Sequence, residues 1–322
     1  MKIVFFGTPD YVLPILEAIH KSFKTKDGDS PIEAVVTQKP KPTGRDQILT
    51  YSPIDTWAHK KNIPIYFDAV DILKDNLQAD LGILASYSQI IPMSVIKAFP
   101  HGILNIHPSL LPKYRGSSPV QAAILNGDNQ TGVSIIKLDE KLDHGPIVTQ
   151  FKEEILADDT SETLRNRLFE KSAQVLVELL PAYMQGKIHP KVQNEKEASI
   201  TTQIKKEDGY IPQETLRAAL IGKTPAKPWE IKFIKNFSVI PTPHTINCFT
   251  RAMTPWPGAW TFVRLSNAQG QETKRLKILK VHTEEIPSTK NNKLILDEIQ
   301  LEGKNKVSWK QFSEGYPTNS IV

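Results

Sequence analysis

The first 150 residues alternate short apolar runs with segments of helical spacing, and this alternation is the feature that most restricts the fold. Apolar runs predict strands at residues 2–6, 32–37, 80–86, 102–107 and 133–138. Helical spacing or a capping residue followed by proline predicts helices at residues 11–23, 52–61, 92–99 and 118–125. Strands that alternate with helices favour an α/β fold with a parallel-rich sheet. Because ligands of such sheets bind beyond the carboxyl ends of the strands, functional residues are expected just after Phe6, Val36, Ala85, Ile106 and Leu138.

A second domain is expected because the chain has 322 residues, more than the roughly 100–200 of one domain. A long helix is predicted at residues 161–184. The segment after it is rich in Lys, Pro, Gln and Glu and has no apolar period, so we read it as a linker. Further on, short alternating strands near residues 259–265, 276–282 and 293–299 are typical of a small β-barrel. The predicted division is a first domain at 1–188, a linker at 189–205 and a second domain at 206–322.

Composition excludes several classes of protein. No run approaches the roughly 18–20 apolar residues of a membrane span. The apolar run at residues 3–6 is too short for the core of a signal peptide. The single cysteine, Cys248, excludes an internal disulfide and a cysteine-based metal site. These features predict a cytoplasmic protein that does not enter a membrane, and nothing in the sequence marks a dimer interface, so a monomer is expected.

The positive charge of the chain is concentrated in its last third. The whole chain carries a net charge of +5, whereas residues 206–322 alone hold 17 Lys and Arg against 11 Asp and Glu. Such an excess is typical of a surface that binds nucleic acid. On charge alone, a lysine-rich surface that serves only solubility is an equally good interpretation.

The densest group of chemically useful side chains follows the strand predicted at residues 102–107. Asn105 and His107 are two residues apart, so on a strand both point to the same side of the sheet. Asp143 follows the next predicted strand and supplies a carboxylate that could reach His107. An amide, an imidazole and a carboxylate without a serine or cysteine nucleophile suit direct attack of an external nucleophile on a carbonyl, with the amide and the ring N–H stabilising the oxyanion. Taken singly, His107 could equally be a satisfied strand-end histidine and Asp143 a turn carboxylate.

Two other kinds of site are not predicted. His101, His107 and His144 do not have the spacing of a metal site, so no metal is expected. The turn at residues 7–10 lacks the glycine spacing of a dinucleotide-binding loop, so no nicotinamide cofactor is expected.

Several strings of this sequence resemble one enzyme family, the methionyl-tRNA formyltransferases, over nearly the whole chain. The strings are Phe6-Gly-Thr-Pro-Asp10, Asn105-Ile-His107-Pro-Ser109-Leu-Leu-Pro112, Leu142-Asp143-His-Gly145 and Pro255-Trp-Pro257. The second and third are specific to enzymes that use 10-formyltetrahydrofolate. The last, together with the basic C-terminal region, narrows the resemblance to the enzymes that act on tRNA.

The resemblance implies a Rossmann-like formyltransferase domain followed by an OB-like β-barrel domain that binds tRNA. It implies transfer of the formyl group of 10-formyltetrahydrofolate to the α-amino group of methionine on initiator methionyl-tRNA, by direct amine attack through a tetrahedral intermediate and without a metal. The catalytic residues that it implies are Asn105, His107 and Asp143. The folate-binding residues would be Ser109, Leu110, Leu111 and Pro112. The tRNA-binding residues would be Lys39, Lys41 and Arg45.

Rival functions remain open on the sequence. A formyltransferase that acts on an amino-sugar nucleotide would share the N-terminal half, and a hydrolase of formyltetrahydrofolate would use water in place of the amine. A tRNA-binding protein with an inactive transferase domain belongs to a different class, and the intact Asn105, His107 and Asp143 argue against it.

Overall fold

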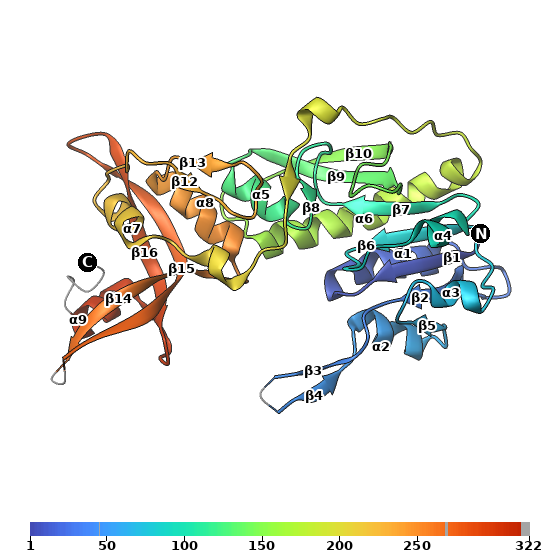
Figure 1. Cartoon of the computed structure of the whole chain (residues 1–322), viewed down its shortest axis with the longest axis horizontal. Helices are drawn as coiled ribbons and strands as arrows, with labels where there is room; N and C mark the ends of the chain where they lie inside the picture. The colour runs from blue at the N-terminus through green and yellow to red at the C-terminus, as the bar shows by residue number, and fades with distance from the viewer. Residues whose placement is uncertain (45, 268–269, 317–322) are drawn as a thin grey trace. The chain divides into compact units, whose positions relative to one another are not determined.

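The computed structural model describes residues 1–44, 46–267 and 270–316 (Figure 1). Packing divides the chain into two compact units, which are described separately. The first contains residues 1–115, 132–153 and 165–198, and the second contains residues 116–131, 154–164 and 199–322.

A seven-stranded sheet forms the centre of the first unit, with the order β10-β9-β7-β6-β1-β2-β5. The strands are β1 (Ile3–Gly7), β2 (Ile32–Val36), β5 (Ile65–Tyr66), β6 (Leu81–Ala85), β7 (Ile103–His107), β9 (Gln130–Lys137) and β10 (Ile147–Glu154). The five strands from β7 to β5 pair in parallel. This sheet is the parallel-rich one that the sequence predicts.

The helices of this unit follow the predicted ranges closely, except that α3 was not predicted. They are α1 (Leu13–Ser22), which continues the short turn η1 (Asp10–Val12), α2 (Pro53–Lys60), α3 (Asp71–Lys74), α4 (Met93–Lys97) and most of α6 (Ser161–Met184). Every residue of β1 and β7 is buried, as expected for strands covered on both faces. Phe6 illustrates the core, since its ring makes edge contacts with Tyr87 and Phe99.

Strand β9 runs antiparallel to β7, with Leu104 opposite Lys137 and His107 opposite Ser134. The carboxyl end of β9 therefore lies beside the start of β7, at the edge of the sheet opposite to the one where His107 ends its strand. Leu138 and Ile106 were expected at the same edge of the sheet, and that expectation was wrong. The apolar pattern shows that a strand exists but does not show its direction.

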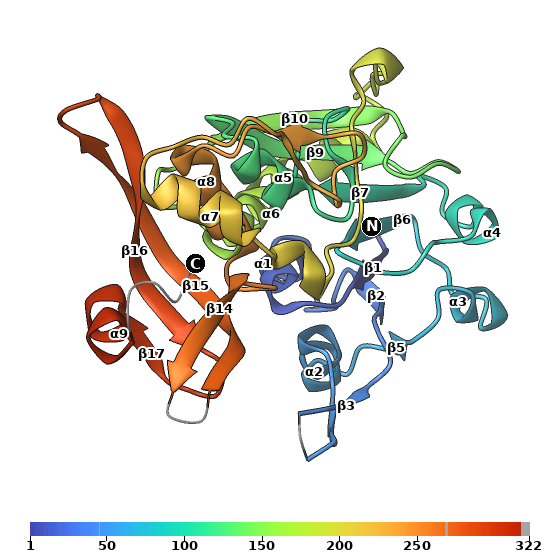
Figure 2. The same cartoon turned by 60° about the vertical axis from the view of Figure 1, so that its left-hand side comes forward.

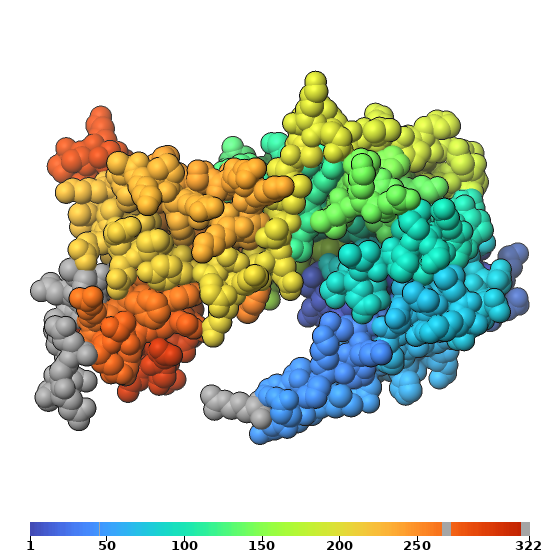
Figure 3. Space-filling view, in the orientation of Figure 1, coloured from blue at the N-terminus to red at the C-terminus, as the bar shows by residue number. Residues whose placement is uncertain are grey.

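The segment that carries Lys39 and Lys41, which the resemblance assigns to tRNA binding, contains a hairpin of β3 (Lys41–Thr43) and β4 (Ile48–Thr50). All six residues of the two strands are exposed, and Figure 3 shows the hairpin as an arm that projects from the surface of the first unit. Ile48, Leu49 and Tyr51 expose more than half of their surface. The hairpin therefore presents apolar side chains to solvent beside its lysines.

The second unit is built around a four-stranded antiparallel sheet with the order β14-β15-β16-β17 (Figure 2). The strands are β14 (Ala259–Asn267), β15 (Gly270–Ile286), β16 (Asn291–Leu301) and β17 (Lys306–Ser308). The helices are α5 (Pro119–Leu125), α7 (Gln213–Leu220), α8 (Pro243–Met253) and α9 (Trp309–Gly315). Helix α8 packs on β14, β15 and β16 and also on α5 and α7. Antiparallel strands thus dominate the C-terminal region, where a small β-barrel was predicted.

Short elements complete the chain. Two-residue strands pair as β8 (Arg115–Gly116) with β11 (Ile200–Thr201) and as β12 (Trp229–Glu230) with β13 (Ser238–Val239). Single turns form at η2 (Glu195–Glu197) and η3 (Lys206–Gly209). In the described part of the chain, no helix is both long enough and apolar enough to cross a membrane.

Replacing Ser52 with alanine is expected to destabilise the first unit by about 1–2 kcal/mol. Ser52 caps α2, because its Oγ accepts a hydrogen bond from the Asp55 amide at 3.0 Å and contacts the Oγ1 of the buried Thr37 at 2.8 Å. Urea unfolding measures the change. Ser94→Ala, at an exposed serine in α4, is the control and should change stability by less than about 0.5 kcal/mol. Equal losses in the two variants would contradict a capping role.

Candidate active site

Strand β7 carries two of the predicted catalytic side chains in the interior of the first unit. Asn105 is 6% exposed and His107 is 4% exposed. Their spacing of two residues on a strand puts both side chains on one face of the sheet. Since β7 lies between β6 and β9, its backbone is paired on both sides and holds the two side chains firmly.

Asp143 meets both of these side chains. Its Oδ1 accepts a hydrogen bond from Asn105 Nδ2 at 3.0 Å, and its Oδ2 lies 3.5 Å from His107 Nδ1. Asp143 lies in the loop between β9 and β10. This loop begins beside the start of β7, because β9 ends there. To bring Asp143 to Asn105 and His107, the loop turns back toward the end of β7. The backbone of Asp143 is left-handed, with a φ of 47°. The three predicted catalytic groups therefore converge, although the loop approaches from an unexpected edge.

The tautomer of His107 follows from its second partner. His107 Nε2 lies 2.9 Å from the carbonyl oxygen of Tyr114, and a carbonyl can only accept, so Nε2 carries a proton. In the neutral ring, Nδ1 is then unprotonated and faces Asp143. The N–H at Nε2 already donates to the Tyr114 carbonyl. If the ring is to donate a hydrogen bond to an oxyanion, the donor must therefore be a protonated Nδ1.

The turn after β7, predicted to bind folate, is held by hydrogen bonds to the chain itself. Ser109 Oγ donates to the Lys113 carbonyl at 2.6 Å, and the Leu111 amide donates to Ser134 Oγ at 2.9 Å. Ser134 Oγ in turn donates to the Ser109 carbonyl at 2.6 Å. Ser109 and Leu111 are buried, whereas Leu110 and Pro112 are partly exposed. The turn is therefore rigid, and only the latter two can present surface to a ligand.

Two buried hydroxyl groups near this edge have no hydrogen-bond partner. Thr8 follows β1 and Tyr87 follows β6. The hydroxyl oxygens of both, Thr8 Oγ1 and Tyr87 Oη, are shielded from solvent and have no hydrogen-bond partner among the described residues. Burial raises the pKa of Tyr87 to about 12, so this phenol is neutral at pH 7. An unpaired buried polar group is costly, so each one in a native structure calls for an explanation, and a bound partner is one such explanation.

The predicted tRNA-binding residues lie elsewhere in the first unit. Lys39 and Lys41 are exposed at the base of the β3–β4 hairpin. Arg45 lies outside the described residues. In the described ranges, no hydrogen bond or ion pair links Lys39 or Lys41 to the predicted catalytic residues.

Two residues that the sequence analysis did not select also touch this region. Gln193 donates hydrogen bonds to the carbonyls of Asp143 and Gly145, each at 2.8 Å, and Arg115 donates to Gln193 Oε1. Arg115 belongs to the Pro- and Gly-rich loop after β7, which is a recognisable signal. Gln193 lies in a polar segment without apolar period, and nothing in the sequence marks it.

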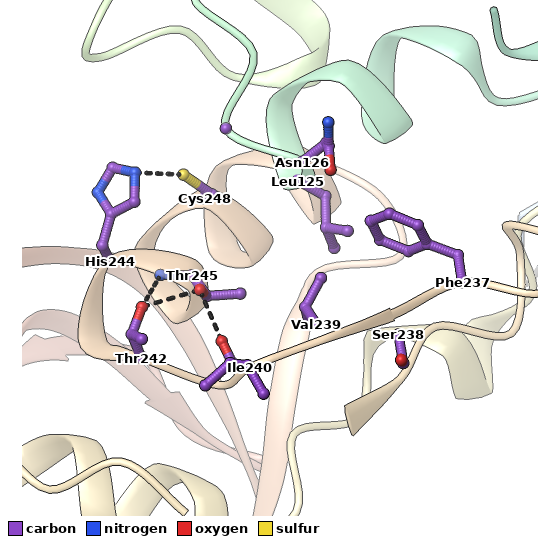
Figure 4. Close-up of a pocket in the computed structure, with 11 residues that line it drawn as sticks. Leu125, Asn126, Phe237, Ser238, Val239, Ile240, Thr242, His244, Thr245 and Cys248 are labelled. Atoms are coloured by element: carbon purple, nitrogen blue, oxygen red, sulfur yellow. Dashed lines mark hydrogen bonds between the residues drawn. The ribbon is translucent and has the colours of Figure 1, made fainter. Parts of the chain in front are cut away.

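A separate pocket of about 330 Å³ lies in the second unit (Figure 4). It is lined by Leu125, Asn126, Gly127, Phe237, Ser238, Val239, Ile240, Thr242, His244, Thr245 and Cys248. None of the predicted site residues lines it. Burial raises the pKa of the Cys248 thiol, so the pocket offers a neutral thiol rather than a thiolate nucleophile. Across the described ranges, no group of three or more His, Cys, Asp or Glu side chains is arranged to hold a metal ion.

Comparison with known proteins shows which family the chain resembles. Residues 1–180 match the formyl transferase family, and residues 242–317 match the formyl transferase C-terminal domain. The methionyl-tRNA formyltransferase of Methylacidiphilum infernorum is 35% identical over 98% of this chain and 95% of its own length.

Solved structures share the fold at lower identity. The methionyl-tRNA formyltransferase of Clostridium thermocellum has a TM-score of 0.53 and 16% identity, covering 94% of this chain and 98% of its own. The N-formyltransferase of Helicobacter canadensis, solved with folinic acid and dTDP-3-aminofucose, has a TM-score of 0.60 and 17% identity, covering 89% of both chains. At such identities the likeness shows the fold alone. The 35% identity over nearly the whole chain and the matches to both formyl transferase domains establish the family. This chain belongs to the methionyl-tRNA formyltransferase family.

Proposed function

We propose that this protein transfers the formyl group of 10-formyltetrahydrofolate to the α-amino group of methionine on initiator methionyl-tRNA. The observation that carries the proposal is the convergence of Asn105, His107 and Asp143, buried on one face of the sheet in a member of this family. Each of the three supplies a different function that acyl transfer to an amine requires.

Asn105 is the oxyanion donor. One N–H of its amide donates to Asp143 Oδ1, and this bond fixes the plane of the amide. The amide nitrogen has a second N–H, which can donate to the oxygen of a carbonyl under attack. A donor held in place before the reaction stabilises the charge that develops on that oxygen without a cost of reorganisation.

His107 and Asp143 handle the proton that the attacking amine must lose. Since Nε2 is committed to the Tyr114 carbonyl, the position that accepts a proton is Nδ1. A proton on Nδ1 would face the Asp143 carboxylate at 3.5 Å, which stabilises the imidazolium. Asp143 therefore favours removal of the amine proton and keeps the ring oriented.

A folate donor suits the unpaired hydroxyls that follow β1 and β6, two strands of the parallel part of the sheet. A pterin carries both donors and acceptors of hydrogen bonds, which are the groups that Thr8 Oγ1 and Tyr87 Oη lack. When bound, 10-formyltetrahydrofolate supplies the activated formyl group. Leu110 and Pro112 offer it partly exposed apolar surface, while Ser109 and Leu111 keep the turn rigid.

The exposed hairpin is the proposed contact for the tRNA. Lys39 and Lys41 are solvent-accessible cations beside exposed apolar side chains, and Arg45 belongs to the same segment. Lysine and arginine bind phosphate groups of nucleic acids, and apolar side chains can pack on bases. We also propose that the protein acts as a monomer in the cytoplasm.

An amino-sugar nucleotide is the weaker candidate substrate. The solved sugar N-formyltransferase shares the fold at 17% identity, whereas the curated relative named for methionyl-tRNA reaches 35% over almost the whole chain. An exposed cationic hairpin suits a polyanionic macromolecule better than a single nucleotide.

Asn105→Ala is expected to lower kcat by about 100- to 1,000-fold, because the oxyanion loses a preorganised donor. Formation of formylmethionyl-tRNA from 10-formyltetrahydrofolate and methionyl-tRNA gives the measurement. Asn166→Ala, on the exposed face of α6, is the control and should retain full activity. Turnover of Asn105→Ala near that of the unmodified protein would refute the assigned role.

Replacing Lys41 or Arg45 with alanine should raise KM for methionyl-tRNA with little change in kcat, since these residues touch phosphate rather than the reacting atoms. Each variant neutralises one phosphate fewer. The slope of the logarithm of the tRNA-binding constant against the logarithm of the salt concentration should therefore become shallower by about 1. Lys97→Ala, at an exposed position in α4, is the matched control. An unchanged salt slope in both hairpin variants would exclude this segment as a tRNA contact.

A further inference from the structure

A short polar segment after α6 contacts the loop that carries Asp143. Ile147, the first residue of β10, and Lys191 exchange two backbone hydrogen bonds, of 2.7 Å from the Ile147 amide and 2.8 Å from the Lys191 amide. This pairing fixes the chain two residues before Gln193. The side chain of Val192 between them is 86% exposed, so the segment follows the surface while Gln193 turns inward.

The side-chain amide of Gln193 has all four of its hydrogen-bonding positions in use. Its Nε2 donates to the carbonyls of Asp143 and Gly145, and its Oε1 accepts from Nε and Nη2 of Arg115 at 3.1 and 2.8 Å. An inverted amide would direct N–H groups at the guanidinium and an oxygen at two carbonyls. The orientation of the amide is therefore determined by its partners, and Gln193 is only 6% exposed.

Arg115 is held on its other side by Glu195. Its Nη1 and Nη2 donate to the two carboxylate oxygens of Glu195 at 3.1 and 2.6 Å, and these bonds are the main cause that lowers the pKa of Glu195. A two-point contact between a guanidinium and a carboxylate fixes the plane of the guanidinium. Arg115 also follows Tyr114, whose carbonyl accepts a hydrogen bond from His107 Nε2.

Gln193 and Arg115 thus join the two loops that supply partners to His107. The loop at residues 138–146 brings Asp143 to Nδ1, and the loop at residues 108–115 brings the Tyr114 carbonyl to Nε2. The bond from Gln193 reaches the backbone of Asp143 itself, which holds a left-handed φ of 47° that side-chain-bearing residues rarely adopt. A displaced Asp143 backbone would change the distances from its carboxylate to Asn105 and His107.

We propose that Gln193, oriented by Arg115, is a positioning residue for formyl transfer: its amide clamps the backbone of Asp143 and thereby sets the carboxylate against Asn105 and His107. The segment at 191–195 then forms part of the active-site support rather than only a connection between domains. This inference rests on the proposed function, because it needs Asp143 to act in the reaction.

The test measures formyl transfer by the full-length protein carrying Gln193→Ala or Gln193→Glu. Because a displacement of about 1 Å at a reacting group can cost about 100-fold in rate, kcat should fall by about 10- to 100-fold. KM for methionyl-tRNA should hardly change. Gln193→Glu keeps the size of the side chain and an oxygen that accepts from Arg115, but it directs a carboxylate oxygen at the carbonyls of Asp143 and Gly145. This variant tests the same role if the alanine variant does not fold. Val192→Ala, at the exposed neighbour, is the control and should have normal kcat.

A double-mutant cycle separates positioning from a general loss of structure. If Gln193 acts through Asp143, its replacement in an Asp143→Asn background should lower the remaining kcat by less than about 3-fold. Equal fold-losses in the two backgrounds, or normal kcat in both folded Gln193 variants, would overturn the inference. Those outcomes leave the proposed function intact as long as the unmodified protein is active and Asn105→Ala is not. An unmodified protein without formyl transfer would instead refute the proposed function itself, and the inference with it.

Discussion

The carboxylate of Asp143 is buried, and a buried charge is stable only when polar groups surround it. Asn105 supplies a hydrogen bond at 3.0 Å, and His107 offers a position that can bear a compensating positive charge at 3.5 Å. The two groups that stabilise the carboxylate are also the groups that acyl transfer needs. In the proposed mechanism, chemical function and the stability of the site therefore depend on the same contacts.

This constraint extends to the backbone around Asp143. Gly145 cannot carry a side chain, because an added Cβ would lie 1.8 Å from the carbonyl oxygen of Lys137. The tight approach lets the Pro146 carbonyl accept from the Lys137 amide, which closes the base of the loop. The loop is thus closed at its base and bonded to Gln193, and both contacts hold the left-handed Asp143 in place beside β7.

Local patterns of the sequence predicted local structure well. The Ser52-Pro53 start of α2 and the ends of α6 agree with the structure, because capping and apolar spacing depend on residues close in the chain. The spacing of Asn105 and His107 also predicted a shared face. The antiparallel direction of β9, the β3–β4 hairpin and the contact of Gln193 with Asp143 were not predicted. The direction of β9 and the hydrogen bonds of Gln193 are decided by partners far away in the sequence. The hairpin is local, but its two strands have only three residues each, which is too short for an apolar period to show.

The distribution of charge complements this local chemistry. An α-amino group has an ordinary pKa of about 8, so it is mostly protonated at pH 7 and must lose a proton to attack. Residues 206–322 carry the net charge of +6, and residues 1–205 are nearly neutral with 23 basic and 24 acidic groups. A strong positive charge would attract a polyanion over a long range but would not select the amine as a target. In the proposed mechanism one proton is controlled through His107 and Asp143, while the excess of positive charge at residues 206–322 adds long-range attraction to the tRNA contacts proposed for Lys39 and Lys41.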